Sequence, residues 1–339
     1  MHLGAGAPPH LPRAIFAQRV MGGVQICMEQ PESQTSTNEA GLKHRVQTFW
    51  NAQSCDTQVA QAEPFSAQYF EQIEAFRYFD QPFIHSFAQF TRFHGKRVLE
   101  VGFGAGTDFI QWLRAGAIAT GIDLTEEALR NLTRRIEVYG MPSPEYVGVA
   151  DAENLPFPSN SFDLGYSFGV LHHTPDTAKA IQELVRVVKP GGEIKVMLYN
   201  RRSIFVFNRW VKYALLRGRF WKSLRWVLWN HTESAGTKGY TRGELKHLFD
   251  QLPVERLRVE TYVTSGDYLS SSALPPLNWI YRLCLAVAGY RFPWRPWHYV
   301  ERANFQEFRP LSITRNHGRE AIFTGNPLGF YHCISARRN

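Results

Sequence analysis

The sequence predicts an α/β fold in which a mainly parallel sheet is covered by helices on both faces. Between residues 97 and 199, strand-like segments such as RVLEV and EIKVMLY alternate with amphipathic, helix-like segments, and this alternation is typical of βαβ units. The connection VKPGGEIK supports it, because Pro190 ends a helix and the next two glycines let the chain reverse.

The expected elements follow in a regular order until Tyr199. Strands are expected at 97–101, 117–123, 144–150, 161–169 and 193–199, and helices at 109–114, 126–139 and 176–188. Regular patterns return with a helix at 240–252 and strands at 254–264 and 330–337. Segment 203–239, rich in Trp, Arg and Phe, and segment 265–325, rich in proline turns, are therefore predicted to be insertions after the fifth and sixth strands.

The chain divides into three parts. Residues 1–42, with scattered Gly, Pro, Gln, Ser and Thr, are expected to be a disordered tail. Residues 43–94 carry apolar residues at helical spacing and are expected to form an N-terminal helical cap, and 95–339 form the main domain.

Cysteine usage and hydropathy indicate the compartment. The four cysteines lie far apart, with no Cys/His pair at metal-ligand spacing, so we expect a reducing, cytoplasmic location and no metal. No apolar run approaches the roughly 20 residues that cross a bilayer, so no transmembrane segment is expected.

The net charge of +8 has a local origin. Eight Lys and Arg residues between 201 and 225 are interleaved with Trp, Phe and Leu. This pattern fits a cap helix with a basic outer face, and it also fits a surface for peripheral contact with the inner face of a membrane. No DNA-binding motif accompanies it, and the oligomeric state is not predicted.

The stretch LEVGFGAGTD places Gly102, Gly104 and Gly106 directly behind the first strand. Glycines there let the backbone approach a ligand closely. A dinucleotide turn would need Gly or Ala at position 107, where this chain has Thr107. Glu100 ends the strand, and its carboxylate would repel a pyrophosphate but attract an ammonium group.

Two further acids follow the next strands. Asp123 lies 21 residues after Gly102, where an acid can accept hydrogen bonds from ribose hydroxyls. Asp151 follows the third strand and is placed to accept from an adenine amine, although an aspartate there is often only a turn residue. Three acids at successive strand ends suit an adenosine that carries a cation and no phosphate, which describes S-adenosylmethionine.

These motifs resemble the class I S-adenosylmethionine-dependent methyltransferases, in the type 11 branch of ubiquinone and menaquinone methyltransferase-like enzymes. The resemblance covers about residues 95–200 and rests on LEVGFGAG, GID, DAENLPFPSNSFD, GVLHHTPD and VVKPGGE, in that order. It implies a Rossmann-like sheet of seven strands with the last strand, FYHCISAR, antiparallel, and S-adenosylhomocysteine as the product. Phe103 departs from the family, where small or polar residues are commoner.

The resemblance also implies a set of cofactor-binding residues: Glu100, Gly102, Gly104, Gly106, Asp123, Leu124, Asp151, Ala152 and Phe168.

Three residues near the methyl-transfer position are candidates for catalysis. Methyl transfer mainly requires alignment and exclusion of water, and a base is needed only for a hydroxyl or an activated carbon. His172 and His173 follow the fourth strand and could take a proton, yet Thr174 and Pro175 beside them also read as a helix start. Tyr199, at the end of the fifth strand, is expected to face the same pocket.

The leading hypothesis is methyl transfer to a small-molecule acceptor, bulky or lipid-like, such as a secondary metabolite, quinone or lipid precursor. An RNA methyltransferase and a non-catalytic cofactor-binding protein remain alternatives. An NAD-dependent oxidoreductase is disfavoured by Thr107 and Glu100.

Overall fold

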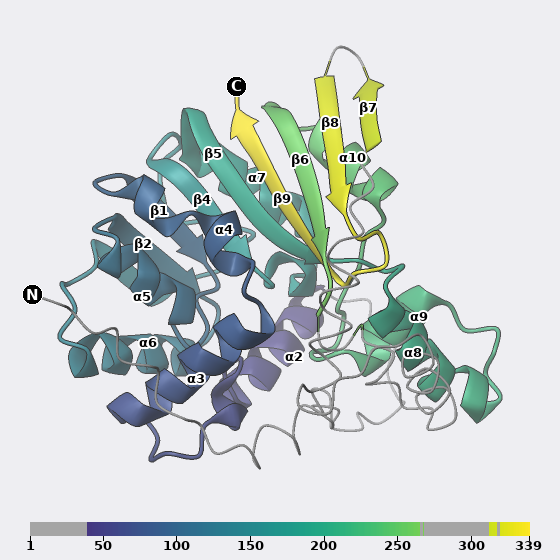
Figure 1. Cartoon of the computed structure of the whole chain (residues 1–339), viewed down its shortest axis with the longest axis horizontal. Helices are drawn as coiled ribbons and strands as arrows, with labels where there is room; N and C mark the ends of the chain where they lie inside the picture. Colours follow the sequence, from purple (N-terminus) through teal and green to yellow (C-terminus); the bar gives the residue numbers. More distant parts are fainter. Residues whose placement is uncertain (1–38, 265–266, 268–311, 317–318) are drawn as a thin grey trace, which may run out of the picture.

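The computed structural model describes residues 39–264, 267, 312–316 and 319–339 (Figure 1). Its nine strands form one sheet in the order β3-β2-β1-β4-β5-β9-β6-β8-β7. The strands are β1 (Arg97–Val101), β2 (Ile118–Asp123), β3 (Tyr146–Val149), β4 (Phe162–Phe168), β5 (Val188–Tyr199), β6 (Val254–Tyr262), β7 (Ser312–Asn316), β8 (Arg319–Gly325) and β9 (Tyr331–Arg338). The α/β fold and the antiparallel last strand are confirmed, since β1 to β5 pair in parallel and β9 runs antiparallel to both β5 and β6.

The predicted count of seven strands is wrong. The two extra strands come from segment 265–325, where β8 pairs in parallel with β6 and β7 pairs antiparallel with β8. Their β-branched and aromatic runs, ITR and AIFT, are short. They follow a proline-rich stretch for which the sequence predicts turns and no strand. Residues 268–311 of this insertion, and residues 1–38 of the expected tail, lie outside the described residues.

Helices precede and connect the strands. They are α2 (Glu39–Ala52), η1 (Thr57–Val59), α3 (Ala67–Asp80), α4 (Ile84–Ala88), η2 (Phe90–Phe93), α5 (Thr107–Arg114), α6 (Glu126–Val138), η3 (Leu171–His173), α7 (Thr177–Val187), α8 (Ile204–Tyr213), η4 (Leu215–Arg217), α9 (Leu224–His231) and α10 (Arg242–Asp250). No described helix is long and apolar enough to cross a bilayer.

The start of α7 differs in detail from the sequence prediction. Asp176, rather than Thr174, is the N-cap residue, because its side chain accepts a hydrogen bond from the Lys179 amide. The Thr174 hydroxyl donates instead to the Leu171 carbonyl, which holds η3 in place.

Successive side chains of each strand point to opposite faces of the sheet, and this creates one apolar layer on each face. Leu99 and Val101 of β1 belong to the cluster that includes α7 and α10, whereas Val98 belongs to the cluster that includes α5 and α6. In Figure 1, α7 and α10 lie behind the sheet and α4 and α5 lie in front of it. Glu100 shares the face of Val98 and is therefore directed into the α5 layer.

The strand order reverses between β1 and β4, and in open α/β sheets such a point forms a ligand crevice at the carboxyl ends of the strands. Figure 1 shows α2 and α3 across this end of the parallel strands, with α8 and α9 beside them. The fold therefore places α2 and α3, the first long helices of the described residues, over the predicted binding turn.

Candidate active site

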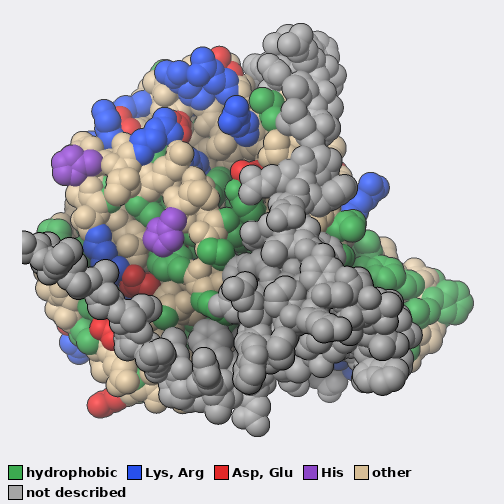
Figure 2. Space-filling view, viewed as in Figure 1, with side chains coloured by type: hydrophobic (Ala, Val, Ile, Leu, Met, Phe, Trp, Pro, Cys, Tyr) green, Lys and Arg blue, Asp and Glu red, His purple; other side chains and the backbone are tan. Residues whose placement is uncertain are grey.

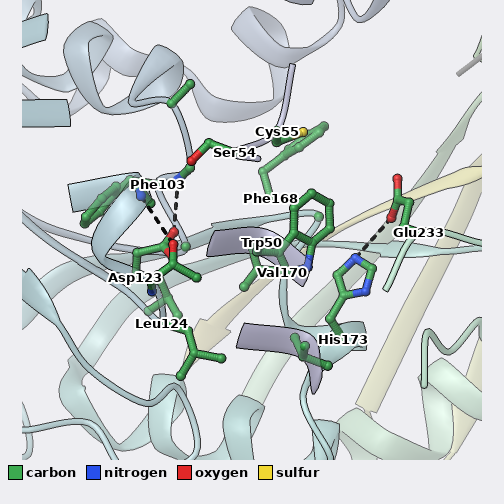
Figure 3. Close-up of a pocket in the computed structure, with 18 of the residues that line it drawn as sticks. Trp50, Ser54, Cys55, Phe103, Asp123, Leu124, Phe168, Val170, His173 and Glu233 are labelled. Carbon is green, nitrogen blue, oxygen red and sulfur yellow. Dashed lines mark hydrogen bonds and ion pairs between the residues drawn. The ribbon is translucent and has the colours of Figure 1, made fainter. Parts of the chain in front are cut away.

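A cavity of about 620 Å³ lies at the carboxyl ends of β1, β2, β4 and β5, beneath α2 and the loop that follows it (Figure 3). This volume is in the usual range for small-molecule sites. Among the predicted site residues, the cavity is lined by Glu100, Gly102, Gly104, Asp123, Leu124, Asp151, Ala152, Phe168, His173 and Tyr199. Gly106 and His172 do not line it.

The glycine turn is shaped by packing as well as by the cavity. A Cβ on Gly102 would lie 2.2 Å from a methyl of Val170, and one on Gly106 would lie 2.7 Å from Leu132. Both residues also have positive φ angles, of 81° and 77°, which disfavour other side chains. Gly106 therefore serves the contact between the turn and α6.

Asp123 is fixed at the end of β2 by local hydrogen bonds. The Gly104 amide donates to Oδ2 at 3.0 Å, and the Thr125 amide and hydroxyl donate to Oδ1 at 3.0 and 2.9 Å. Burial raises the pKa of Asp123, against the opposing effect of these donors. Its carboxylate thus joins the first two turns and still has lone pairs directed to the cavity.

Asp151 has a partner that the sequence did not indicate. Lys43 of α2 lies 2.5 Å from the Asp151 carboxylate and 2.7 Å from that of Glu153. Burial would lower the pKa of Lys43, but its hydrogen bonds to both carboxylates raise it. The ion pairs hold the first half of α2 over the loop that follows β3.

Glu100 is directed into the core. It is 3% exposed and accepts a hydrogen bond from the Trp112 indole at 2.9 Å. Burial, together with the nearby Asp108 carboxylate, raises its pKa well above the ordinary value. A carboxyl group in this state attracts an ammonium group less strongly than the sequence argument assumed.

The charged pair beside Glu100 is Arg77 and Asp108. Arg77 donates from Nε and Nη2 to the two oxygens of Asp108, at 3.1 and 2.8 Å, and it lies 3.4 Å from Asp56. The hydroxyls of Tyr78 and Tyr166 donate to Asp108 as well, at 3.1 and 2.8 Å. Both Arg77 and Asp108 line the cavity, so a guanidinium group lies next to the glycine turn.

The far end of the cavity contains His173 and Glu233, which lie to one side of Trp50 while Asp123 and Leu124 lie on the other (Figure 3). His173 Nε2 is 3.2 Å from a Glu233 oxygen. The Tyr199 hydroxyl donates to both Glu233 oxygens, at 3.0 and 2.9 Å. Burial opposes ionisation of Glu233, but the contacts from His173 and Tyr199 prevail and lower its pKa.

Two hydroxyls face His173 Nδ1. Ser234 Oγ lies 2.9 Å and Thr237 Oγ1 lies 3.0 Å from it, and the Thr237 hydroxyl donates to the Ser234 carbonyl at 2.7 Å. Nδ1 can therefore accept from Ser234 or donate to Thr237. When both ring nitrogens carry a hydrogen, Thr237 and Glu233 face them as acceptors, so the site can hold an imidazolium.

His172 has a different environment. Its ring is fully buried, neither nitrogen has a hydrogen-bond partner, and burial lowers its pKa well below the ordinary value. The ring packs on Tyr199 with centroids 3.8 Å apart. His172 is therefore a neutral packing residue beneath Tyr199.

The residues present fit an adenosine ligand. Asp123 provides a carboxylate for ribose hydroxyls, and Ile122, Leu124 and Ala152 provide apolar walls for a base. The backbone of Gly104 borders the cavity, where the closest atom to an added Cβ is 3.8 Å away. This combination accommodates a nucleoside without requiring a phosphate.

Part of the chain is similar to known proteins. A family described as a methyltransferase domain matches residues 99–196. The chain is 36% identical over 110 residues to a phthiotriol/phenolphthiotriol dimycocerosates methyltransferase of Mycobacterium ulcerans, which covers 32% of this chain and 39% of that protein. It is 33% identical over 195 residues to a 2-methyl-6-phytyl-1,4-hydroquinone methyltransferase of Synechocystis sp., which covers 55% of each chain.

A solved structure extends the likeness of fold. The geranyl diphosphate C-methyltransferase of Streptomyces coelicolor aligns with a TM-score of 0.50 at 13% identity, over 88% of this chain and 98% of that one. The curated relatives are matched over about two fifths to just over half of their length. Residues 99–196 therefore form a methyltransferase domain.

Proposed function

We propose that the protein methylates a hydroxyl group on a bulky, lipid-like small molecule. The observation that carries this proposal is the contact between His173 and Glu233 at the end of the cavity opposite Asp123. A hydroxyl is a poor nucleophile until its proton is removed, so its methylation benefits from a base at this end. An amine that is already neutral carries its own lone pair and would not need one.

In this proposal His173 is the base. S-adenosylmethionine supplies an electrophilic methyl group and leaves as S-adenosylhomocysteine. His173 Nε2 receives the proton of the acceptor hydroxyl, and Glu233 stabilises the imidazolium that forms. Tyr199 acts as a positioning residue, because both of its hydrogen bonds go to the Glu233 carboxylate.

The remaining residues would hold the cofactor. We assign Asp123 to the ribose, Asp151, Leu124 and Ala152 to the adenine, and Phe168 to the side of β4. Gly102, Gly104 and Glu100 would border the methionine end, where Arg77 offers a cation for its carboxylate. Segment 43–94 would act as a cap, since Lys43 and Trp50 reach the cavity from it.

The acceptor class rests on two features. The walls around His173 are largely aromatic and apolar, including Trp50, Val170 and Tyr331. The relatives named above act on a dimycocerosate and on a phytyl hydroquinone, both of which carry long apolar groups. A phenol or alcohol with such a chain would suit a cavity of this kind.

Incubation with methyl-labelled S-adenosylmethionine and separate acceptors tests the proposal. The panel contains a long-chain phenol or hydroquinone, an amine lipid such as phosphatidylethanolamine, and RNA. We expect label in an ether-linked methyl group of the hydroxylated acceptor. Label confined to RNA or to the amine would contradict the proposal, as would cofactor binding without turnover on any acceptor.

Removal of the Asp123 carboxylate should weaken cofactor binding. We expect Asp123→Ala to raise the dissociation constant of S-adenosylhomocysteine about 10- to 100-fold, because charge-assisted hydrogen bonds contribute roughly 1.5–3 kcal/mol each. Titration calorimetry measures this dissociation constant. Asp163→Ala is the control, because Asp163 lies at the end of β4 that faces away from the cavity. Unchanged affinity in folded Asp123→Ala, or tight NAD binding by the native protein, would refute the assignment.

A further inference from the structure

Exposed apolar side chains gather on the helices that follow β5. Six of the large hydrophobic residues exposed in the described part of the chain come from α8, η4, α9 and their connections: Phe207, Leu215, Leu216, Phe220, Trp221 and Trp229. We call these residues the α8–α9 surface. Phe220 and Trp221 are 66% and 67% exposed. Figure 2 shows apolar side chains at the right-hand edge of the molecule, where α8 and α9 lie in Figure 1.

Hydrogen bonds fix the helices that carry the α8–α9 surface. The Trp210 indole donates to the Lys222 carbonyl at 2.7 Å, and Arg209 donates to the His231 carbonyl at 2.7 Å, so both helices and their connection are tied together. The Asp267 carboxylate accepts from the Phe205 amide at 2.9 Å, which anchors the start of α8. Its apolar side chains are thus held outward by a folded support.

The positive charge of this segment indicates an anionic partner. Residues 201–232 contain eight Lys and Arg residues and no Asp or Glu. Lys212 and Arg217 are exposed beside the apolar side chains. Aromatic and aliphatic side chains mixed with cations are the composition that enters the interface of a bilayer with anionic lipids, where the rings lie at headgroup level.

We propose that the α8–α9 surface docks on an anionic lipid bilayer. The surface adjoins the acceptor end of the cavity, because only three residues separate Trp229 from Glu233. Docking there would bring the cavity to the place where a lipid-like acceptor resides. The binding itself requires neither methyl donor nor acceptor, so it stands apart from the proposed function.

Co-sedimentation of the full chain with vesicles tests this proposal. The vesicles are phosphatidylcholine alone, or phosphatidylcholine with about one third phosphatidylglycerol, at about 0.05 M and 0.5 M salt. We expect binding to the anionic vesicles at low salt and much weaker binding at high salt. Phe220→Ser with Trp221→Ser should weaken partition about tenfold or more.

Two further variants separate charge from apolar contact. Lys212→Gln and Arg217→Gln should each weaken partition about fivefold, as expected for one charge near an anionic surface. Val138→Ser with Tyr146→Ser, which removes exposed apolar side chains elsewhere, is the matched control and should leave partition unchanged. All variants should keep the native affinity for S-adenosylhomocysteine.

Several results would overturn the docking proposal. They are absence of binding to anionic vesicles at low salt, equal loss of binding in the matched control, tight RNA binding without vesicle binding, and a native dimer that Phe220→Ser with Trp221→Ser dissociates without any vesicle binding. Methyl transfer to a short-chain, water-soluble acceptor does not depend on docking. A failure of docking is therefore distinguishable from a failure of the proposed function.

Discussion

Replacing His173 with asparagine should lower the turnover number about 100- to 10,000-fold, the range that general-base catalysis contributes. The reason is that the His173 ring lies at the acceptor end of the cavity, with the Glu233 carboxylate 3.2 Å from Nε2 to stabilise an imidazolium. Asparagine retains a polar group for Ser234 and Thr237 but cannot take up the proton. Affinity for S-adenosylhomocysteine should stay within about twofold, since the base lies away from Asp123.

Glu233→Gln provides a second measurement. It removes the negative charge that faces the imidazolium formed in the reaction, so the turnover number should fall while the affinity for S-adenosylhomocysteine stays within about twofold. A merely structural role for Glu233 would lower the turnover number and the affinity together.

Two controls can contradict the assignment. His172→Phe keeps the packing on Tyr199 and should retain most of the activity. If it abolishes turnover while His173→Asn does not, the base is misassigned. The donor atoms of His172, His173 and Glu233 lie within 4.8 Å of one another, so a chelator is the second control. Loss of activity on chelation, restored by a divalent metal, would replace the proton-transfer mechanism.

Arg77→Met should destabilise the protein by about 3–5 kcal/mol, the usual result of removing one partner of a buried ion pair. The Asp108 side chain is 1% exposed and would keep only the Tyr78 and Tyr166 hydroxyls as partners. Urea denaturation measures the loss. Arg114→Met is the matched control, because Arg114 pairs with Glu74 at the surface and its loss should cost at most about 1 kcal/mol.

The stability lost in Arg77→Met should depend on pH. Burial opposes ionisation of Asp108, but Arg77 beside it prevails and lowers the pKa of Asp108. The ion pair therefore stabilises the native fold at pH values above the ordinary aspartate pKa, and this contribution is lost as the pH falls below that range. Without Arg77, burial would raise the pKa of Asp108. The difference between Arg77→Met and the native protein should therefore shrink between pH 7 and pH 5, and an equal difference at both would contradict this account.

The elements that the sequence predicted well are those determined by local patterns. Alternation between strands and helices located β1 to β5. The spacing from Gly102 located Asp123, whose carboxylate accepts a hydrogen bond from the Gly104 amide. β7 and β8 escaped prediction because short strands gain most of their stability from a neighbouring strand that local sequence does not reveal.

The charged partners of the site were not predictable from the sequence. Lys43 and Asp151 are 108 positions apart, and Arg77 and Asp108 are 31 apart. Glu233 lies in the basic, aromatic insertion, where nothing local indicates a partner for His173. Such pairs depend on how remote helices pack over the sheet, whereas periodicity reports only the structure of each segment. The single available signal was Asp108 within the turn LEVGFGAGTD, as an acid in the first turn of α5.

The position of β9 has a consequence for the order in which the molecule assembles. β9 lies between β5 and β6, so β6, β8 and β7 join the rest of the sheet only through it. These three strands precede β9 during synthesis, yet they have no place to dock until β9 emerges. Its pairing joins Tyr199 to Tyr331 across more than a hundred residues, a long-range closure that slows folding. Nascent chains should therefore carry a preformed cofactor half, β1 to β5, beside an unattached β6–β8 pair with exposed strand edges, which is when the protein is most prone to aggregate.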